Sequence, residues 1–322
     1  MIDIELLLQD FGRYYKNGGQ GKKDIRRKLL DSTETAQLFP IYKTDDTLVR
    51  STKTLMNKVH QSFQKKWTPK GDIKFTPLEI KNFKHKINLE FYPDDLERSY
   101  LGFEEFIGKE ENRALWPFIK WFILNEIIPQ DQQDVEVDEI FFGKYADPVD
   151  GTPSAPGTSM DGIKTIINKG IDAGSITPIV IGAWDSDDKI LVEQMEAFVE
   201  AWPEPYKSAD STVFVNRTLA TRYMRGFDLK YNQNHSAAVN NMCLRYRPNI
   251  SIKGLRSHGT SQKIWSSPVQ NRVKLVKKSE NMDSMGVTSK DFTCVQVSSH
   301  YWMGIGFWNG EEVFTNDREL AL

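Results

Sequence analysis

Residues 41–92 read IYKTDDTLVRSTKTLMNKVHQSFQKKWTPKGDIKFTPLEIKNFKHKINLEFY. This stretch has two strand-like halves, 47–63 and 73–91, and the alternation of apolar and polar residues is clearest between Phe83 and Phe91. The Pro, Gly and Asp residues between positions 67 and 72 are typical of a turn. We therefore predict one long hairpin with its tip at residues 67–72.

The predicted hairpin has too little apolar surface to form a domain by itself. A two-stranded ribbon is only marginally stable in water, so we expect another surface to support it. Its basic tip would discourage pairing with stray strands, because charged side chains block exposed strand edges. The residues that we expect to contact a neighbouring subunit are Lys65, Lys66, Trp67, Lys70 and Lys74.

Opposite charges are segregated along the chain. Residues 43–86 contain 11 Lys and Arg against 4 Asp and Glu, a net charge of about +7. Residues 90–150 contain 16 acidic against 5 basic residues, about −11, although the whole chain carries only −2. Such patches steer and orient partners more than they add affinity. A subunit that grips its neighbours is the prediction, and a set of solvated charged faces is the simpler alternative.

Composition indicates an ordinary globular protein. The chain has 322 residues, of which 39% are hydrophobic and 27% charged, enough for two domains with a substantial core. Cys243 and Cys294 lack the spacing of a metal site or a disulfide framework, so we expect reduced thiols. The N-terminus lacks the positive charge of a secretory signal, and residues 116–128 are shorter than the about 20 that span a bilayer. We expect a soluble, intracellular chain with no membrane partner.

The first 40 residues are predicted to form a flexible, basic N-terminal arm. A Gly-rich segment at 17–21 precedes a run of basic residues. Such a run would bind nucleic acid through counterion release, and an acidic protein face would attract it equally well. The basic residues of this arm are Arg13, Lys22, Lys23, Arg26 and Arg27.

A helix that is apolar on nearly every side is predicted at 116–128. It must be covered by its own domain or by a neighbouring subunit. We expect Pro129 to end it and residues 134–145 to form a half-buried strand, because Val135 and Val137 alternate with acids. The apolar residues assigned to this helix are Trp116, Phe118, Trp121 and Phe122.

A loop rich in Pro, Gly and Ser at 147–159 separates two parts of the chain. The expected helices that follow it are 161–171, 188–201 and 216–226, and the expected strands are 176–181, 212–215, 264–276, 292–297, 301–307 and 311–315. Mixed helices and strands of this kind predict an α+β fold.

Signatures of enzymes and metal sites are missing from the sequence. The five histidines show no paired metal spacing. The segment around Gly18 to Lys23 is not a phosphate-binding loop, because Lys16 and Lys23 stand where that loop needs Gly and Ser or Thr. Asp185 and Asp187 lack the remaining ligands of a calcium loop, so helix capping explains them better. No catalytic residue, metal or cofactor is therefore assigned.

The order of these elements resembles the major capsid proteins of tailed bacteriophages, the Hong Kong 97-type fold. Short segments share the resemblance: Met160-Asp161-Gly162-Ile163 opens a helix after a Pro/Gly loop, and Val213-Phe214-Val215-Asn216 leads into a helix. Trp265-Ser266-Ser267-Pro268-Val269-Gln270-Asn271 precedes a basic strand. The resemblance covers nearly the whole chain.

This resemblance implies four regions. They are an N-terminal arm (1–40), an extended loop (41–92), a peripheral domain with a spine helix (93–154 and 280–322) and an axial domain (155–279). It also implies hexamers and pentamers that tile an icosahedral shell around double-stranded DNA, scaffolding and portal proteins as partners, and a place in the virion after assembly in the host cytoplasm.

Three alternatives remain open at this point. A protein compartment built on the same fold would enclose protein instead of DNA. A nucleic-acid-binding protein would use the basic arm and the hairpin with Trp67. A hydrolase would use carboxylates such as Asp185 and Asp187.

Overall fold

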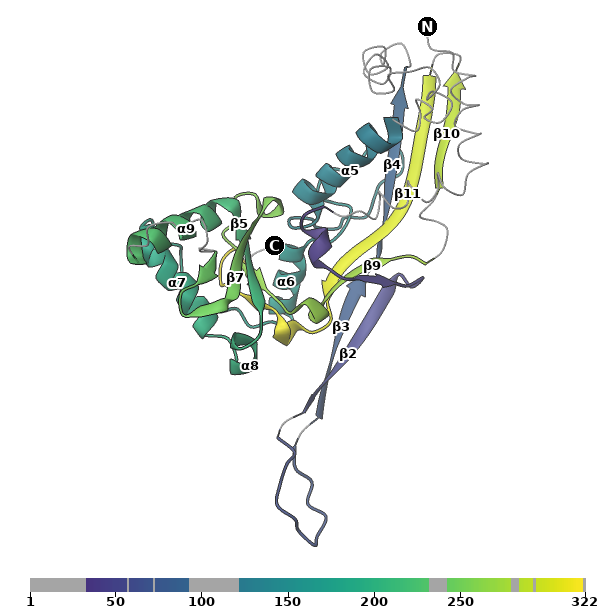
Figure 1. Cartoon of the computed structure of the whole chain (residues 1–322). Coiled ribbons are helices and arrows are strands. Elements are labelled where there is room, and N and C mark those ends of the chain that lie inside the picture. The colour runs from purple at the N-terminus through teal and green to yellow at the C-terminus, as the bar shows by residue number, and fades with distance from the viewer. Residues whose placement is uncertain are drawn as a thin grey trace, which may run out of the picture.

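The computed structural model describes residues 33–56, 58–71, 73–92, 122–231, 242–278, 284–291 and 294–320. Within these ranges the chain forms two five-stranded sheets and a separate two-stranded hairpin. Figure 1 shows the long strands of the first sheet, the helix-covered second sheet beside them, and the hairpin extending away from both. The α+β class predicted from the sequence is confirmed.

The first sheet is organised around one long strand, β11 (Cys294–Phe307). On one side, β11 pairs antiparallel with β4 (Phe83–Phe91). On the other side it pairs with β10 (Ser284–Asp291) and then with β9 (Arg272–Val276). The edge strand β1 (Ile41–Lys43) lies parallel to β9. Strand β11 therefore pairs directly with three strands, of which β4 lies about two hundred residues away in the sequence.

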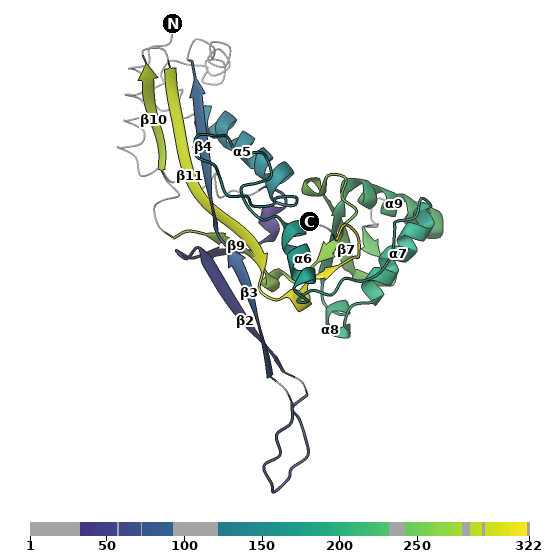
Figure 2. The same cartoon turned by 180° about the vertical axis from the view of Figure 1, so that it is seen from behind.

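One continuous helix covers a face of this sheet beside β4 and β11 (Figures 1 and 2). It consists of two wide π-helical segments and a central α-helix: η4 (Ile123–Ile127), α5 (Ile128–Asp134) and η5 (Val135–Glu139). Ile123, Leu124, Ile127 and Ile128 are buried. The sequence predicted a helix that is apolar on nearly every side, but Asn125 and Glu126 are exposed, so its described part buries one face.

Two expectations about this helix are wrong. The helix does not end at Pro129. In the π-helical turn before this proline, the Ile128 N–H bonds to the Ile123 carbonyl, five residues earlier. This wider spacing changes the hydrogen-bond register just before the proline ring, so the helix continues past it. Residues 135–139 are helical and not a strand. The alternation of Val135 and Val137 was misleading, because Glu136 between them is itself buried.

The second sheet has the strand order β12-β8-β5-β7-β6. Helices α7 and α9 pack against each other over it, and their apolar faces share one core with Val213, Val215 and Ile252. The strands are β5 (Ser211–Asn216), β6 (Cys243–Leu244), β7 (Arg247–Leu255), β8 (Trp265–Ser266) and β12 (Phe314–Thr315). The helices are α6 (Ile163–Asp172), α7 (Asp188–Glu200), α8 (Glu204–Lys207) and α9 (Arg217–Tyr231).

Four short 3-10 turns complete the described fold: η1 (Ala36–Leu38), η6 (Arg256–His258), η7 (Val269–Asn271) and η9 (Gly310–Glu312). The strand expected at 176–181 is reduced to one isolated bridge between Ile179 and Asn316. The stretch 264–276 is divided into β8 and β9 by η7.

Residues 33–40 connect the two sheets. Ala36 and Phe39 are buried in the core, and the Phe39 ring lies 5.8 Å from the rings of both Trp265 and Phe307. Of the predicted N-terminal arm, only this packed segment is described, and a flexible arm cannot include it. For residues 1–32, which lie outside the described residues, the arm stays a prediction.

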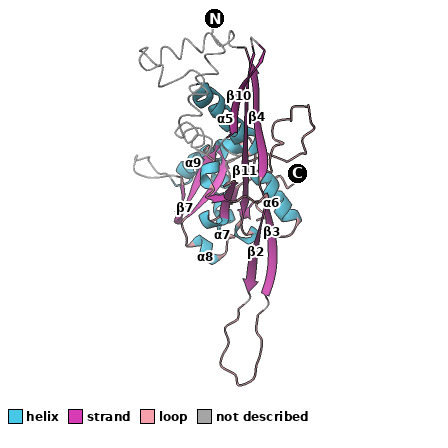
Figure 3. Ribbon diagram, turned by 90° about the vertical axis from the view of Figure 1, so that its right-hand side faces the viewer, coloured by secondary structure: helices cyan, strands magenta, loops and turns pink. Residues whose placement is uncertain are grey.

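The hairpin consists of β2 (Leu48–Met56) and β3 (Ile73–Lys81), paired in an unbroken antiparallel register from Leu48–Lys81 to Met56–Ile73. The return strand expected over 73–91 is therefore two strands. After Asn82 the chain leaves the hairpin, and β4 joins the first sheet. Figure 3 shows β2, β3, β4, β10 and β11 aligned along one long axis of the molecule.

Strand membership departs from the predicted domain division at two points. Strand β9, predicted to belong to the axial region, pairs with β11 in the first sheet. Strand β12, predicted to belong to the peripheral region, pairs with β8 in the second sheet. The four domain boundaries themselves stay a prediction.

Candidate inter-subunit surface

The base of the hairpin is anchored on the first sheet. Ile80 is buried against Val273 and Leu275, and Val49 packs against the same cluster. Gly306 in β11 leaves the space for this contact, since a Cβ there would stand 2.7 Å from the Ile80 side chain. At Gly304 a Cβ would overlap the carbonyl oxygen of Lys81. Two glycines in β11 thus allow the end of β3 to lie directly on the sheet.

One described ion pair joins the two strands next to this anchor. Arg50 and Glu79 form an exposed ion pair at 3.0 Å, an interaction that contributes about 0–1 kcal/mol. Lys74 lies opposite Leu55 in the ladder, but its side chain is outside the described structure. Among the described side chains, Ile80 and Val49 hold the base of the hairpin to the sheet, and the backbone ladder joins its two strands.

The tip of the hairpin, residues 58–71, is exposed throughout. Its shape is held by its own hydrogen bonds. Lys70 Nζ donates to the carbonyl of His60 at 2.6 Å, and Gln61 Nε2 donates to the carbonyl of Thr68 at 2.8 Å. The tip is therefore ordered before it meets any partner, which lowers the entropic cost of binding.

Large apolar side chains at this tip are left in solvent. Trp67 is 95% exposed and Phe63 is 92% exposed, and Val59 is also exposed. Fully burying one such side chain contributes roughly 1.5–3 kcal/mol, so leaving both aromatic rings in water indicates a docking surface. Lys65, Lys66 and Lys70 are exposed beside them, as the sequence analysis expected.

The predicted spine helix is described from Phe122 onward. The Phe122 ring packs 5.2 Å from the ring of Phe91 at the end of β4, so this residue faces the first sheet. Trp116, Phe118 and Trp121 lie outside the described residues, as do the predicted arm residues Arg13, Lys22, Lys23, Arg26 and Arg27. Their roles stay predictions.

Several acids of the 90–150 block serve inside the subunit. Glu136 accepts hydrogen bonds from the backbone N–H and the hydroxyl of Thr35. Glu139 accepts from the N–H groups of Gly157 and Ser159, at 2.9 and 3.1 Å. Part of the acidity that the sequence assigned to a partner surface therefore positions the helix and the following loop.

Asp131, in α5, contacts strand β11 through Tyr301. The Tyr301 hydroxyl donates to it at 2.9 Å, and burial raises the pKa of Asp131 from 3.8 to about 6. On the other side of Tyr301, the His85 ring stacks at 4.9 Å, and burial lowers the pKa of His85 to about 4. This titratable cluster joins the helix to strands β4 and β11.

Asp185 and Asp187, the carboxylates of the hydrolase alternative, are used for helix capping. Asp187 accepts from the Lys189 N–H at 2.9 Å and caps α7, and Asp185 accepts from the Asp187 N–H at 2.8 Å. Among the described residues, no group of three or more His, Cys, Asp or Glu side chains is arranged to hold a metal ion. In the same part of the chain, no helix is long and apolar enough to cross a membrane.

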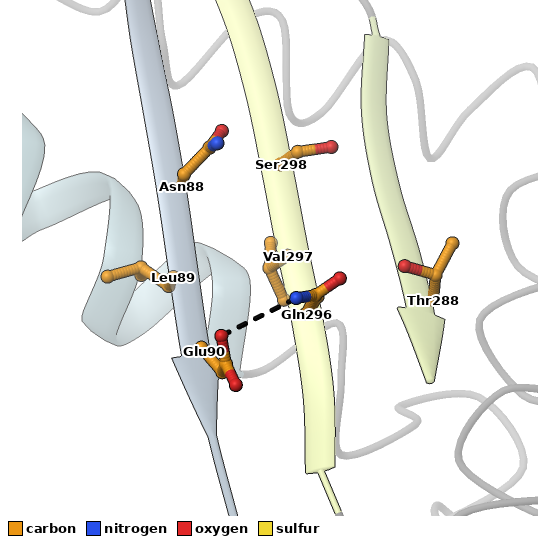
Figure 4. A pocket seen from close by; sticks show the side chains of 7 residues that line it. All are labelled: Asn88, Leu89, Glu90, Thr288, Gln296, Val297 and Ser298. Atoms are coloured by element: carbon orange, nitrogen blue, oxygen red, sulfur yellow. Dashed lines mark hydrogen bonds between the residues drawn. The ribbon is translucent and has the colours of Figure 1, made fainter. Parts of the chain in front are cut away.

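A shallow depression of about 230 Å³ lies on the exposed face of the first sheet. Figure 4 shows it between β4, β11 and β10, lined by Asn88, Leu89, Glu90, Thr288, Gln296, Val297 and Ser298. Gln296 Nε2 already donates to Glu90 at 3.4 Å, and Cys294 Sγ to the same carboxylate at 3.3 Å. The depression is open and its charged group is engaged, so it offers no chemistry for catalysis.

The residues that hold the hairpin base were missed by the sequence analysis. Ile80 was not distinguished from the other apolar residues of its strand. Gly304 and Gly306 lie inside β11, within the strand expected at 301–307, but no close contact was predicted for them. Two glycines spaced by two in a strand mark close backbone approach, and this signal could have identified the contact.

Comparisons with solved structures identify the fold. A chain of the satellite phage P4 procapsid including size determination (Sid) protein matches with a TM-score of 0.60, 11% identity, and coverage of 92% of this chain and 90% of that chain. The capsid of Myoviridae phage XM1 matches with a TM-score of 0.52 and 12% identity over 88% of this chain and 90% of that one. The capsid of the native GTA particle gives 0.52 and 12%, over 87% and 88%.

No protein-family model matches the chain, and no curated protein matches it in sequence. The structural matches extend over nearly the whole length of both chains, so they concern the entire architecture and not one domain. The chain has the Hong Kong 97-type fold.

Proposed function

We propose that this chain is a major capsid protein that assembles with copies of itself into the icosahedral head of a tailed phage. The observation that carries the proposal is the exposed hairpin, whose tip leaves Phe63 and Trp67 in solvent on a fold shared with chains of capsid structures. An exposed apolar projection of this kind marks an interaction site, and a shell subunit would use it to bind its neighbour.

The mechanism of this function is physical. The basic tip lies across an acidic surface of the next subunit, while apolar side chains and strand contacts supply buried area. Permanent assemblies bury on the order of 2,000 Å² or more at each interface. Because one exposed ion pair contributes only about 0–1 kcal/mol, repetition around closed rings supplies the cooperativity.

The finer features are part of the same proposal. Hexamers and pentamers tile the shell, the enclosed polymer is double-stranded DNA, and separate scaffolding and portal proteins assist assembly. The chain resides in the virion and in the host cytoplasm during assembly. The basic N-terminal arm contacts either DNA or an acidic protein face.

Charge reversal at the tip tests the proposal. Reversing Lys65, Lys66, Lys70 and Lys74 to Glu should leave a folded subunit that assembles poorly, because the tip then repels the acidic neighbour. Negative-stain microscopy and sedimentation of the purified protein measure closed particles, and circular dichroism measures folding.

Two matched double variants distinguish the effect of charge at the hairpin tip from the effect of the subunit's net charge. Lys65→Glu with Lys66→Glu should reduce assembly, whereas Lys189→Glu with Lys278→Glu, on exposed lysines outside the hairpin, should not. Normal shells from the tip variant would contradict hairpin docking. A wild-type protein that forms no cages under any condition, or one whose cages enclose protein cargo instead of DNA, would overturn the phage-head assignment.

A further inference from the structure

A second ordered projection leaves the body of the subunit between the covering helix and α6. Its neck is closed by backbone hydrogen bonds from the Lys144 N–H to the Gly157 carbonyl at 2.8 Å and from the Ala146 N–H to the Thr158 carbonyl at 3.1 Å. We call residues 144–158 the acidic loop. The carboxylate of Glu139 also holds the neck through the Gly157 N–H.

The outer end of the acidic loop is a defined turn. The Thr152 N–H donates to the Val149 carbonyl at 3.2 Å, and Gly151 has φ of 80°, a conformation that glycine adopts without strain. Three prolines at 148, 153 and 156 restrict the backbone further. The loop is therefore preorganised, as the hairpin tip is.

Residues 144–156 of the acidic loop are all exposed. Val149 is 70% exposed, and Asp147 and Asp150 lie on either side of it in the sequence. Tyr145 is also largely exposed on one side, while its ring packs 4.8 Å from the ring of Phe83 at the start of β4. The outer part of the loop thus combines apolar side chains with negative charge, and no described part of its own subunit covers it.

The hairpin tip has the complementary composition. Residues 58–71 contain Lys58, Lys65, Lys66 and Lys70 and no acid, together with the exposed Val59, Phe63 and Trp67. Other acids of the 90–150 block are engaged inside the subunit, since Glu136, Glu139 and Asp131 accept hydrogen bonds from Thr35, the loop neck and Tyr301. Asp147 and Asp150 instead stand on the exposed surface of the loop, where Asp147 accepts a hydrogen bond from the Tyr145 side chain of the loop itself.

We propose that the acidic loop of one copy receives the basic hairpin tip of a second copy. The contact places Phe63 and Trp67 against Val149 and the loop prolines, and brings Lys65 and Lys66 to Asp147 and Asp150. The hairpin tip and the acidic loop are both exposed within one copy, so their opposite charges and apolar side chains would meet only when two copies bind. The inference rests on the proposed shell function, because it names the surface that the hairpin meets there.

Compensating charge reversal tests the pairing. Asp147→Lys with Asp150→Lys, and Lys65→Glu with Lys66→Glu, should each lower the fraction of protein in particles by about tenfold. Combining all four substitutions in one chain should restore assembly, because the opposite signs then face each other again. The matched control reverses Glu126 and Asp134, exposed acids of the covering helix, and should not rescue the tip variant.

Cross-linking gives a readout that does not depend on closed particles. In a background of Cys243→Ser and Cys294→Ser, a chain with Trp67→Cys is mixed with a chain carrying Val149→Cys and treated with a short bismaleimide. A heterodimer on a denaturing gel supports the contact. Leu229→Cys, an exposed position on α9, serves as the negative partner.

The outcomes separate the two levels of the proposal. Wild-type protein that forms no shells contradicts the proposed function, and the cross-link then decides the contact by itself. Shells from the wild type together with normal shells from the loop variant, or rescue by Glu126→Lys with Asp134→Lys, overturn the acidic loop as the receiving surface. Cross-linking to Leu229→Cys as strong as to Val149→Cys does the same.

Discussion

Strands β3 and β4 are consecutive, equally long and joined at Asn82, yet they have opposite surroundings. Strand β4 pairs with β11 over its whole length and buries Phe83 and His85 beneath the covering helix. Strand β3 pairs with β2 within the described residues, and Ile80 is the buried anchor among its described side chains, at positions 79–81. Alternation is clearer in β4, whereas β3 contains Pro77, which suits an edge strand, so local sequence contributes to the difference together with the partner strand.

The comparison shows that the molecule divides one continuous stretch between fold and assembly. Strand β4 contributes Phe83 to the main core, whereas the described anchor of β3, Ile80, packs in a small separate cluster at the hairpin base. Substitutions at the base of the hairpin should therefore change the free energy of unfolding, and substitutions at its tip should change assembly alone.

The largest effect on stability is expected at Gly304. Gly304→Val should destabilise the subunit by about 3 kcal/mol, because the new side chain overlaps the Lys81 carbonyl and forces β3 off the sheet. Urea unfolding measures the change. Gly286→Val in β10 is the matched control, since a Cβ there meets only Ser298 Oγ at 3.4 Å and should be tolerated. Equal effects of the two variants would refute the close-approach role.

Removal of the hairpin anchor should have a slightly smaller effect. Ile80→Ala leaves a cavity beside Val273 and Leu275 and should cost about 2–3 kcal/mol. The hairpin should also become sensitive to limited proteolysis, because its base is released. A variant as protease-resistant as the wild type would show that the backbone ladder alone fixes the hairpin.

Asp131 offers a pH-dependent test of the contact between the helix and the first sheet, because it bonds Tyr301, which stacks on His85 of β4. Its folded pKa is raised, so the stabilisation linked to its proton is complete below pH 3.8 and is lost as the pH rises through about 6. Asp131→Asn should therefore stabilise the subunit by about 1–2 kcal/mol at pH 8 and give no gain at pH 4. Unfolding midpoints at both pH values measure this. A gain of the same size at both would exclude titration of Asp131 as the cause.

The smallest effect on stability is expected at the tip. Phe63→Ser and Trp67→Ser should each change the free energy of unfolding by less than about 0.5 kcal/mol, because both rings are in solvent within one subunit. The same variants should reduce particle yield. A large loss of stability in either one would mean that the tip is supported by its own chain, contrary to the contrast with β4.

Features that depend on residues close together in the chain could be predicted from the sequence. Alternation between Phe83 and Phe91 predicted β4, Asp187 predicted the start of α7, and the turn residues and lysines predicted an exposed basic tip. These features depend on side-chain periodicity, capping and turn chemistry, all of which act over a few residues.

Features that depend on distant partners could not be predicted in the same way. Glu136 is buried because Thr35, about one hundred residues away in the sequence, donates to it. The helix continues through Pro129, and β9 joins the first sheet, for reasons that appear only after the chain has folded. The acidic loop was recognised only as a domain boundary, because its ordered turn and closed neck carry no strong sequence signal.

The narrow support of the hairpin makes it a lever arm. Nine paired residues at about 3.3 Å each carry the tip roughly 30 Å from the base, so a tilt of about 10° there would swing the tip by about 5 Å. A small change in the tilt of the hairpin at Ile80 and the two glycines would then produce a larger displacement of the tip. In the proposed shell, a pivot of a few residues would then set the curvature without a change in either contacting surface.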